Sequence, residues 1–296
     1  MQITGETAVY GIVGSPVEHS LSPIFQAHFV QQSGMNAVYV PYHVNGVDLA
    51  TAMRGLLAIG VQGVNVTVPY KEAVLPYVHA DDDVLRIGAA NTLKVSDQGW
   101  RAYNTDWKGV SAVMQGTGLI LQGATILLFG AGGTARAVLH AAHHQNIATV
   151  KICNRSSERA YALIEHARLA YPEMHCEWIA WDQLAVDQAS AQSLLLLNTT
   201  SIGLDGHQTF PFVLSGEGWA MDAVYHPSGS TAFTRAAMTS RGERVVDGLP
   251  MLVAQGACSF EIWHPEVKLD MVEALLWMMK TLKRDPLLLP AWRSVG

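Results

Sequence analysis

Residues 124–135, with the sequence ATILLFGAGGTA, decide the fold because they predict a buried strand, a tight turn and the beginning of a helix. The uninterrupted apolar run 124–129 is typical of a strand buried within a parallel sheet. Gly130 can adopt the tight turn, Gly132 lets backbone amides approach a pyrophosphate, and the small Ala135 permits close packing of the helix on the strand. A dinucleotide-binding turn is therefore predicted, and the alternative is a glycine-rich connection that binds no ligand. The six residues of the turn are Gly130, Ala131, Gly132, Gly133, Thr134 and Ala135.

The end of the next predicted strand indicates which dinucleotide this turn would bind. A site for NAD is expected to carry Asp or Glu about 20 residues after the glycines, where the carboxylate holds the ribose hydroxyls. Here the strand ends in Cys153-Asn154-Arg155 instead. Asn154, Arg155, Ser156 and Arg159 offer hydrogen-bond donors and positive charge where an acid would repel a 2′-phosphate, which favours NADP. The alternative is that Ser156 caps a helix and both arginines are only solvated.

Strand-like and helical segments alternate on both sides of residues 124–135, which predicts an α/β fold of two domains, each built on a largely parallel sheet. The first domain is expected to span 1–106 and to be completed by helices within 248–296. The second, a Rossmann-like domain, is expected to span 107–247, with a cleft between the two. Strands are predicted at 8–13, 37–44, 63–66, 124–129, 149–153, 175–179, 194–198 and 219–223, and helices at 22–33, 47–59, 107–115, from the glycine turn through 144, at 249–263 and at 267–281.

Two serines lie just before the first predicted helix, in the segment GSPVEHSLSP of residues 14–23. Ser22 followed by Pro23 is by itself typical of a helix N-cap with proline at the first helical position. Ser20 is not explained by that cap. The serine pair therefore indicates a polar site beside the start of the helix.

Further polar side chains follow predicted strands of the first domain, at the edge where α/β sheets bind ligands. The segment NVTVPYK of residues 65–71 ends a strand and enters a turn, so Thr67 and Lys71 can emerge at one edge. A single lysine is usually a solubilising surface residue, but Lys71 stands among apolar and turn residues. Asn91 and Asp106 bring an amide and a carboxylate towards what we expect to be the same edge. Asp106 alone is also typical of a helix N-cap.

Composition excludes several other classes of function. The 296 residues are 49% apolar and 15% charged, with a net charge of −6 and no long basic face, so nucleic acid is not an expected partner. The N-terminus lacks a signal-peptide pattern, and no uncharged stretch approaches the roughly 18 apolar residues of a membrane span. Cys153, Cys176 and Cys258 form no CxxC pair and suggest reduced thiols in the cytoplasm. The 12 histidines lack HExxH spacing, so no metal site is expected.

The motifs occur in an order that resembles shikimate dehydrogenase along nearly the whole chain. The matching segments are GSPVEHSLSP, NVTVPYK, GAANTL, NTD, GAGGTA, NRSSER, NTTSIG, DAVYHP and GLPMLVAQG. The resemblance implies a substrate domain joined to a Rossmann domain. It also implies reversible, NADPH-dependent reduction of 3-dehydroshikimate to shikimate, on the pathway to chorismate and the aromatic amino acids.

The resemblance also assigns roles to residues. Lys71 and Asp106 match the catalytic pair, in which the ammonium would polarise the carbonyl and supply its proton while the carboxylate orients the ammonium. The substrate carboxylate is assigned to Ser20 and Ser22. The substrate's hydroxyls and neighbouring positions are assigned to Thr67, Asn91 and Gln255, and Tyr225 matches a position near the substrate. Asn154, Arg155, Ser156 and Arg159 match the adenosine-phosphate site, and Gly248 matches a position near the nicotinamide.

Two rival functions remain open from the sequence. A quinate or dual quinate/shikimate dehydrogenase would share the fold and the pair of Lys71 and Asp106. A cofactor-binding sensor would keep the glycine turn without the chemistry, although retention of both catalytic residues argues against it. In each case the expected partners are a small molecule and NADP, with the chain acting as a monomer or homodimer.

Overall fold

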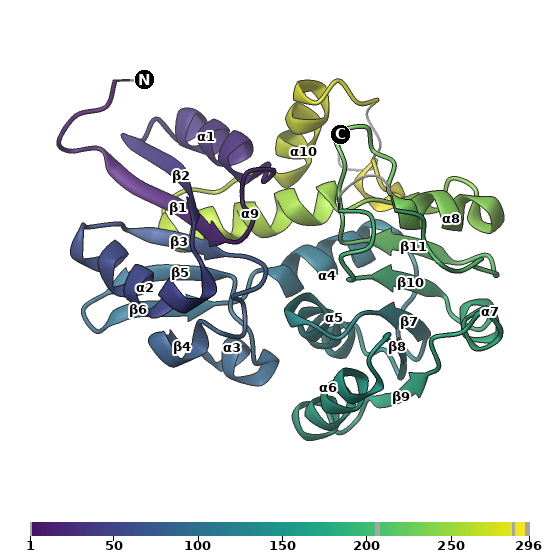
Figure 1. Ribbon diagram of the computed structural model, residues 1–296. Helices are drawn as coiled ribbons and strands as arrows, with labels where there is room; N and C mark the ends of the chain where they lie inside the picture. The colour runs from purple at the N-terminus through teal and green to yellow at the C-terminus, as the bar shows by residue number, and fades with distance from the viewer. Residues whose placement is uncertain (1, 205–207, 286–287, 294–296) are drawn as a thin grey trace. The chain divides into compact units, whose positions relative to one another are not determined.

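The computed structural model describes residues 2–204, 208–285 and 288–293 (Figure 1). Contacts divide the chain into two compact units, of which unit 1 comprises Met1–Lys108 and Val253–Ala274 and unit 2 comprises Gly109–Leu252 and Leu275–Gly296. The sequence placed all of 248–296 with the first domain, whereas the contacts assign 248–252 and the part after Ala274 to unit 2. The physical reason lies in packing, since a Cβ added to Gly116 would lie 2.6 Å from Leu289 and 2.8 Å from Trp292.

Unit 1 is built on a mixed six-stranded sheet with the order β2-β1-β3-β5-β6-β4 within the described residues. β1 pairs in parallel with β2 and β3, and β4 with β6, whereas β5 is antiparallel to both β3 and β6. The hairpin of β5 and β6 was not predicted, and it makes the sheet mixed where the sequence favoured a largely parallel one. The elements are β1 (Ala8–Gly14), α1 (Ser22–Ser33), β2 (Ala37–His43), α2 (Leu49–Ala58), β3 (Gly63–Val66), β4 (His79–Ala80), α3 (Asp82–Ile87), β5 (Thr92–Ser96) and β6 (Gly99–Tyr103), with short 3₁₀ turns at Gly46–Asp48 and Leu75–Tyr77.

The two faces of this sheet are covered by different helices. Val13, Val64 and Leu93 point to one face and form a core with Met53 of α2 and Val84 of α3. The opposite face packs against α1 and α9 (Leu249–Trp263), as the ring contacts Phe29–Phe260 and Tyr10–Trp263 show. Because side chains alternate along each strand, residues of the α9 face such as Asn65 are brought to this helix.

Unit 2 contains a parallel sheet with the order β12-β11-β10-β7-β8-β9 in the described part of the chain. Read from the opposite edge, this is the 3-2-1-4-5-6 order of a Rossmann fold, with β7 as its first strand. The prediction of a Rossmann-like domain around residues 124–135 is therefore confirmed. Its elements are β7 (Thr125–Phe129), α5 (Gly133–His144), β8 (Thr149–Cys153), α6 (Ser157–Ala170), β9 (His175–Ile179), α7 (Gln183–Ala191), β10 (Leu195–Asn198), β11 (Trp219–Asp222), α8 (Ala232–Arg241) and β12 (Val245–Val246).

Three further helices, α4 (Asp106–Gly116), α9 and α10 (Met271–Thr281), each contain a boundary between the units, and a 3₁₀ turn follows at Pro290–Trp292.

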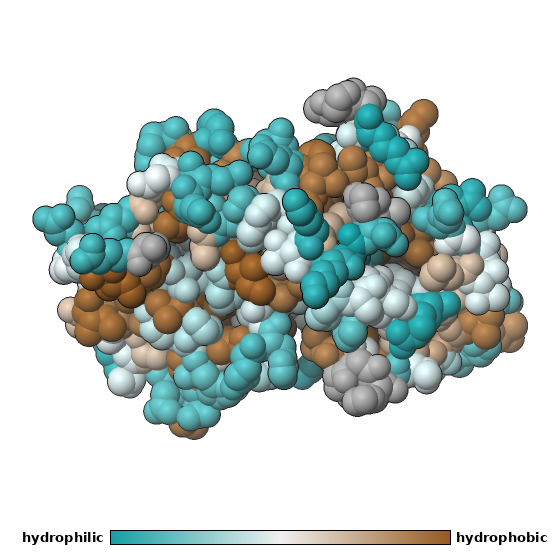
Figure 2. Space-filling model, turned by 90° about the horizontal axis from the view of Figure 1, so that it is seen from above, coloured by the Kyte–Doolittle hydropathy of each residue, from teal (hydrophilic) through white to brown (hydrophobic). Residues whose placement is uncertain are grey.

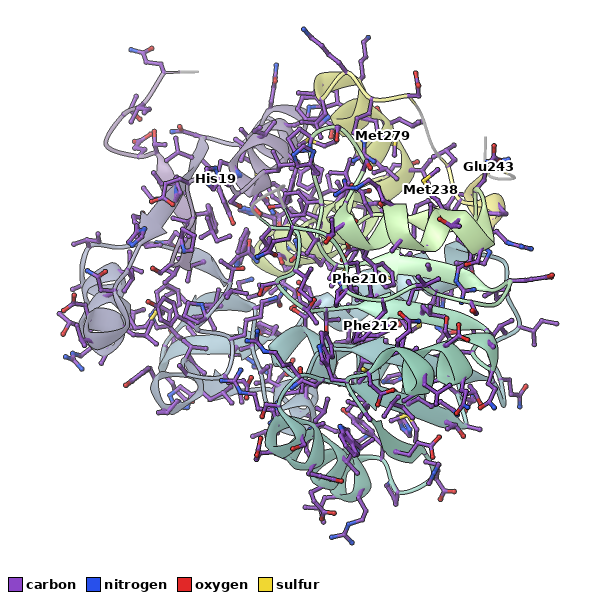
Figure 3. The ribbon with its side chains drawn as sticks, turned by 45° about the vertical axis from the view of Figure 1, so that its right-hand side comes forward. His19, Phe210, Phe212, Met238, Glu243 and Met279 are labelled. Atoms are coloured by element: carbon purple, nitrogen blue, oxygen red, sulfur yellow. The ribbon has the colours of Figure 1, made fainter. Side chains whose placement is uncertain are left out.

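An aromatic core lies on one face of the unit 2 sheet. Phe210 and Phe212, labelled in Figure 3, contact Phe129 of β7 with ring centroids 5.2 and 6.3 Å apart. Phe233 of α8 joins the same cluster, so Phe210, Phe212 and Leu214 of the connection after β10 are packed on the sheet.

Exposed apolar side chains are spread over many elements. They include Val47, Ile59, Ile120, Leu169 and Leu184, and the face seen in Figure 2 shows apolar and polar residues intermixed. Single exposed apolar residues of this kind are normal for a folded protein. No helix in the described ranges is long and apolar enough to cross a membrane.

Candidate active site

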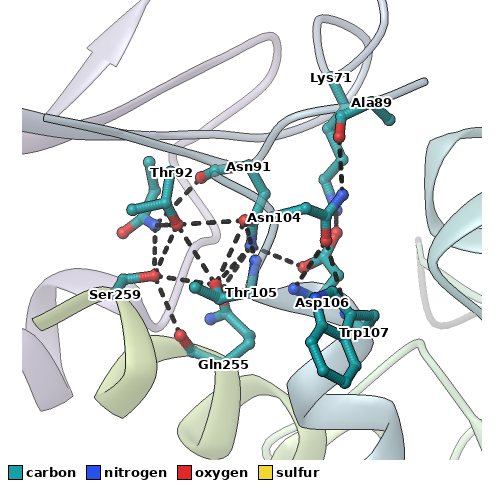
Figure 4. A network of polar contacts seen from close by, with 11 residues as sticks. Lys71, Ala89, Asn91, Thr92, Asn104, Thr105, Asp106, Trp107, Gln255 and Ser259 are labelled. Carbon is teal, nitrogen blue, oxygen red and sulfur yellow. Dashed lines mark hydrogen bonds and ion pairs between the residues drawn. The ribbon is translucent and has the colours of Figure 1, made fainter. Parts of the chain in front are cut away.

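The centre of the candidate site in unit 1 is an ion pair between Lys71 and Asp106. Lys71 lies in the turn after β3, and Asp106 is the first residue of α4. The Nζ atom of Lys71 donates to Oδ2 of Asp106 at 2.6 Å (Figure 4). Both side chains are largely buried, with exposed fractions of 14% and 4%. The ammonium is thus held at a fixed place, on a side chain that is still partly accessible.

Asn91 fixes the other oxygen of the same carboxylate. Its Nδ2 atom donates to Oδ1 of Asp106 at 2.8 Å and also contacts Gln255 Oε1 at 3.0 Å and Thr105 Oγ1 at 2.9 Å. The Oδ1 atom of Asn91 accepts the backbone N–H of Thr105 at 2.7 Å. Because an amide has two N–H hydrogens and three acceptors surround them, its donors are fully used in this arrangement.

Helix α9 extends this network through residues one helical turn apart. Ser259 follows Gln255 by four positions, so both side chains lie on one face of the helix. The Ser259 hydroxyl contacts Thr92 Oγ1 at 2.7 Å and Thr105 Oγ1 at 3.0 Å (Figure 4). It also accepts a hydrogen bond from Asn65 at 3.0 Å. Sequence reasoning missed Ser259. The available signal was its i+4 spacing from Gln255 on a helix that was itself predicted.

Asn104, and not Asp106, caps helix α4. The Oδ1 atom of Asn104 accepts the backbone N–H groups of Asp106 at 3.0 Å and Trp107 at 3.4 Å. Its Nδ2 atom donates to the carbonyl of Ala89 at 2.8 Å. The interpretation of Asp106 as an N-cap is therefore wrong, because the orphan amides of the helix already have an acceptor in Asn104.

The serine segment also differs from the capping interpretation. Helix α1 begins at Ser22 with Leu21 as its N-cap, and the Leu21 side chain makes no capping hydrogen bond. Ser22 is buried, whereas Ser20 is half-buried and its hydroxyl oxygen accepts the backbone N–H of Ser22 at 3.2 Å. Ser22 as an N-cap is thus a wrong prediction, since its backbone is already helical. Thr67, also half-buried, follows β3 and donates its backbone N–H to Val13 at 2.9 Å.

In the glycine turn of unit 2, Gly130 and Gly132 differ in whether the fold has room for a side chain. Gly130 has φ of +107°, and a Cβ there would meet Thr199 Oγ1 at 2.5 Å. Gly132 is the N-cap of α5, and apart from Gly132 and its two chain neighbours no atom of the described chain lies within 4 Å of a Cβ built on it. Ala135 is fully buried against the sheet. The first N–H groups of α5 thus begin beside open space, which fits an anionic pyrophosphate. Ala131, Gly133 and Thr134 are all partly exposed around this point.

The end of β8 presents cationic side chains without a neighbouring aspartate or glutamate on the strand itself. Arg155 and Arg159 are both exposed. Ser156 is the N-cap of α6, accepting the backbone N–H of Arg159 at 3.3 Å and donating to Glu158 at 2.7 Å, so the capping interpretation of Ser156 is confirmed. The hydrogen bond from Ser156 also lowers the pKa of the Glu158 carboxyl. Asn154 donates to the carbonyl of Ser156 at 2.8 Å, which shapes this turn.

Tyr225 and Gly248 lie close together in unit 2. The Gly248 backbone N–H donates to the carbonyl of Val224, the residue before Tyr225, at 2.9 Å. A Cβ on Gly248 would lie 2.3 Å from the carbonyl oxygen of Ala223, so only glycine permits this approach. Tyr225 itself is half-buried.

In the described residues no group of three or more His, Cys, Asp or Glu is placed to hold a metal ion.

Comparisons with known proteins identify the family. A family model described as the shikimate dehydrogenase substrate-binding domain matches residues 12–93. The NADP(+) shikimate dehydrogenase of Moorella thermoacetica is 37% identical over 271 residues, which cover 89% of this chain and 90% of that protein. The chain belongs to the shikimate dehydrogenase family. Its fold agrees with the crystal structure of the Aquifex aeolicus shikimate dehydrogenase, with a TM-score of 0.80, 32% identity and coverage of 96% and 100% of the two chains.

A second solved shikimate dehydrogenase, from Thermus thermophilus in complex with NADP(H) and shikimate, matches with a TM-score of 0.79 at 29% identity, covering 93% of this chain and all of that one. In this chain, one hydrogen-bonded network joins four of the predicted site residues, which are Lys71, Asn91, Asp106 and Gln255. Ser20, Ser22 and Thr67 belong to unit 1 as well but are not part of that network. Tyr225, Gly248 and the nucleotide residues belong to unit 2.

Proposed function

We propose that this protein catalyses the reversible, NADPH-dependent reduction of 3-dehydroshikimate to shikimate. The observation that carries the proposal is the buried pair of Lys71 and Asp106, held by Asn91 within a member of the shikimate dehydrogenase family. Unit 1 is assigned the substrate and unit 2 the cofactor. The three cysteines, which are free thiols, are consistent with a cytoplasmic enzyme.

Lys71 has the chemistry that carbonyl reduction requires. As the carbonyl oxygen gains negative charge, a nearby ammonium stabilises it and then donates a proton from Nζ. When bound, NADPH supplies the hydride. Asp106 keeps the Nζ atom in position through its 2.6 Å contact. In the reverse direction the neutral amine would accept the proton of the shikimate hydroxyl.

The polar residues around the pair suit a small polyhydroxylated acid. Ser20 and Ser22 are assigned to the substrate carboxylate, and Thr67, Gln255 and Tyr225 to its hydroxyls and neighbouring positions. Neutral hydroxyls and amides can pair with many substrate groups, and each unpaired buried group would be costly. Since the donors of Asn91 are already used, a substrate hydroxyl that accepts a hydrogen bond from its Nδ2 atom must replace one of its present partners.

The proposed cofactor site lies at the start of α5 and the end of β8. The residues of the glycine turn, 130–135, would hold the pyrophosphate, with open space beside Gly132 supporting this assignment. Asn154, Arg155, Ser156 and Arg159 would meet the 2′-phosphate. Gly248 is assigned a place near the nicotinamide.

An assay of NADP⁺ reduction with shikimate tests this function, run beside quinate and beside NAD⁺. We expect the highest kcat/KM with shikimate and NADP⁺. A higher value with quinate would assign the protein to quinate oxidation. A purified, folded protein that binds NADPH but turns over neither acid would overturn the enzymatic proposal in favour of a sensor.

A further inference from the structure

The loop that carries Tyr225 connects β11 to α8 and is held by two buried carboxylates. Asp222 ends β11, and Asp247 lies just before α9. Both are almost fully buried, at 0% and 3% exposure. A buried carboxylate is costly unless its oxygens are paired, so the partners of these two residues define what the loop depends on.

Asp222 holds the residue before Tyr225 and the end of the loop. One carboxylate oxygen accepts the backbone N–H of Val224 at 3.0 Å and the amide of Asn198 at 2.8 Å. The other accepts the hydroxyl of Thr231, the N-cap of α8, at 2.6 Å. Asp222 is therefore satisfied by neutral donors alone.

Asp247 lies beside the segment that carries Tyr225, and its main partner is a cation. Its Oδ1 atom accepts the backbone N–H of Leu249 at 3.4 Å, and Gly248, the residue after Asp247, donates its backbone N–H to the carbonyl of Val224 at 2.9 Å. Arg284, from the segment after α10, donates to both oxygens at 3.0 Å in a bidentate pair, and the side chains of Arg284 and Asp247 are 8% and 2% exposed. Such a pair fixes orientation as well as charge.

Arg284 also supports the loop from a second direction. Gly229 has φ of +79°, and a Cβ on it would lie 2.9 to 3.1 Å from the guanidinium atoms. The loop backbone therefore passes directly against the guanidinium. Removing Arg284 would leave a buried carboxylate without its cation and a gap under Gly229, so the backbone on the C-terminal side of Tyr225 would lose its support.

We propose that Arg284 is a positioning residue that sets the place of the Tyr225 side chain through Asp247 and Gly229. The inference rests on the proposed function, because Tyr225 is assigned there to the substrate. Arg284 acts through this loop and not by contact with substrate or cofactor. Its loss should therefore affect the use of shikimate more than the use of NADP⁺.

The test uses Arg284→Met in the full-length enzyme, with Arg284→Lys as the conservative variant. We expect Arg284→Met to raise the KM for shikimate about tenfold or more while the KM for NADP⁺ stays within about twofold. Arg284→Lys should recover part of that loss. Arg168→Met is the matched control, because Arg168 also forms an arginine–carboxylate pair, with Glu165, but on the surface.

A double-mutant cycle with Tyr225→Phe separates positioning from simple destabilisation. If Arg284 acts through Tyr225, the effects of Arg284→Met and Tyr225→Phe on kcat/KM will be clearly less than multiplicative. Multiplicative effects, or a lower active fraction with both KM values unchanged, would overturn the proposal. Should Arg284→Met fail to fold, the same cycle with Arg284→Lys decides. An inactive wild-type enzyme would instead contradict the proposed function.

Discussion

The carboxylate of Asp106 could in principle cap a helix or hold a cation, and its neighbour Asn104 decides between these roles. Asn104 supplies the acceptor for the first amides of α4. Both oxygens of Asp106 are thereby left for side chains, one for Lys71 and the other for Asn91. A carboxylate fixed on both oxygens has little freedom to rotate, so it can hold the ammonium in one place.

At this scale the first prediction concerns Lys71→Met, which keeps most of the side-chain volume but removes the proton donor. We expect kcat to fall by about 10²- to 10⁴-fold, the usual contribution of a positioned acid or base. The KM for shikimate should change far less, because the other polar residues of the site remain. Steady-state kinetics with shikimate and NADP⁺ measure both values, with Lys268→Met on an exposed lysine as the control. Near-normal turnover would remove Lys71 from the mechanism.

The sequence revealed the residues of the site better than their partners. Lys71, Asn91 and Asp106 stand in recognisable motifs at strand ends, so their meeting at one edge of unit 1 could be anticipated. Ser259 carries no motif and lies more than 150 positions from Thr105, which it contacts at 3.0 Å. Only the packing of α9 on the sheet brings them together, and periodicity within a helix does not indicate which strand it will meet.

In the turn from β7 into α5, the fold itself requires glycine at one position and leaves room for a side chain at another. Gly130 is needed by the fold, because its φ is positive and a Cβ would clash with Thr199. Gly132 has ordinary backbone angles and open space around a built Cβ. Its requirement, if it has one, comes from a ligand.

The second prediction therefore compares Gly130→Ala with Gly132→Ala. Gly130→Ala should lower the free energy of unfolding by about 1 to 3 kcal/mol, as expected for a strained backbone position. Gly132→Ala should cost less than about 1 kcal/mol, the scale of a changed N-cap, yet weaken NADP⁺ binding because the new methyl group occupies the space proposed for phosphate. Urea unfolding and calorimetric titration with NADP⁺ measure the two effects. Equal NADP⁺ affinity in Gly132→Ala and wild type would contradict the placement of the pyrophosphate.

The third prediction concerns the start of α6, where Arg155 and Arg159 are proposed to meet the 2′-phosphate. Replacing both by Ala should raise the KM for NADP⁺ by about tenfold or more and leave that for NAD⁺ little changed, because only NADP⁺ carries the extra phosphate. The ratio of kcat/KM for the two cofactors is the measurement. Glu158→Gln is an informative companion, since it removes the negative charge beside the same turn and should favour NADP⁺. A cofactor ratio unaffected by the double substitution would place the phosphate elsewhere.

Elements were predicted best where their ends carry clear signals. The bounds of α1 and α9 agree with the sequence, and α1 has Pro23 in its first turn and Gly34 at its C-cap. The hairpin of β5 and β6 was missed. Its signals were present in the alternating segments TLKVS and GWRAY around a short turn ending at Gly99, whose φ is +101°. Two short adjacent strands are easily overlooked when the segments before and after them alternate between strand and helix.

For the molecule as a whole, the two-domain α/β plan followed from the alternation of elements, whereas the exact division of the C-terminal segment did not. The residues after α10 belong to unit 2 because of contacts far apart in sequence, such as the pair of Arg284 and Asp247. Such contacts leave no local pattern. The same packing buries carboxylates of unit 2, such as Asp222 and Asp247. Because a buried carboxylate loses its hydration, folding stability should depend on pH.

The fourth prediction follows from Asp222. Burial raises the pKa of its carboxyl from 3.8 to about 7, although hydrogen bonds from Thr231, Val224 and Asn198 oppose the shift. Between about pH 4 and about pH 7 the folded state therefore binds more protons at this site than the unfolded state, so its contribution to stability decreases as pH rises through that window. Asn at this position cannot titrate. As pH rises through this window, the unfolding free energy of wild type should therefore fall relative to that of Asp222→Asn, by up to about 1.4 kcal/mol per pH unit. Above the window the difference should level off.

Urea unfolding of both proteins at several pH values from 4 to 8 measures this difference, with Glu243→Gln as a surface control from the same unit. The absolute stability of Asp222→Asn is expected to be lower, because three donors converge on the carboxylate and an amide supplies only one acceptor oxygen. The slope, not the offset, carries the inference. Parallel curves for wild type and Asp222→Asn would mean that Asp222 stays ionised throughout, held by its three neutral donors despite complete burial.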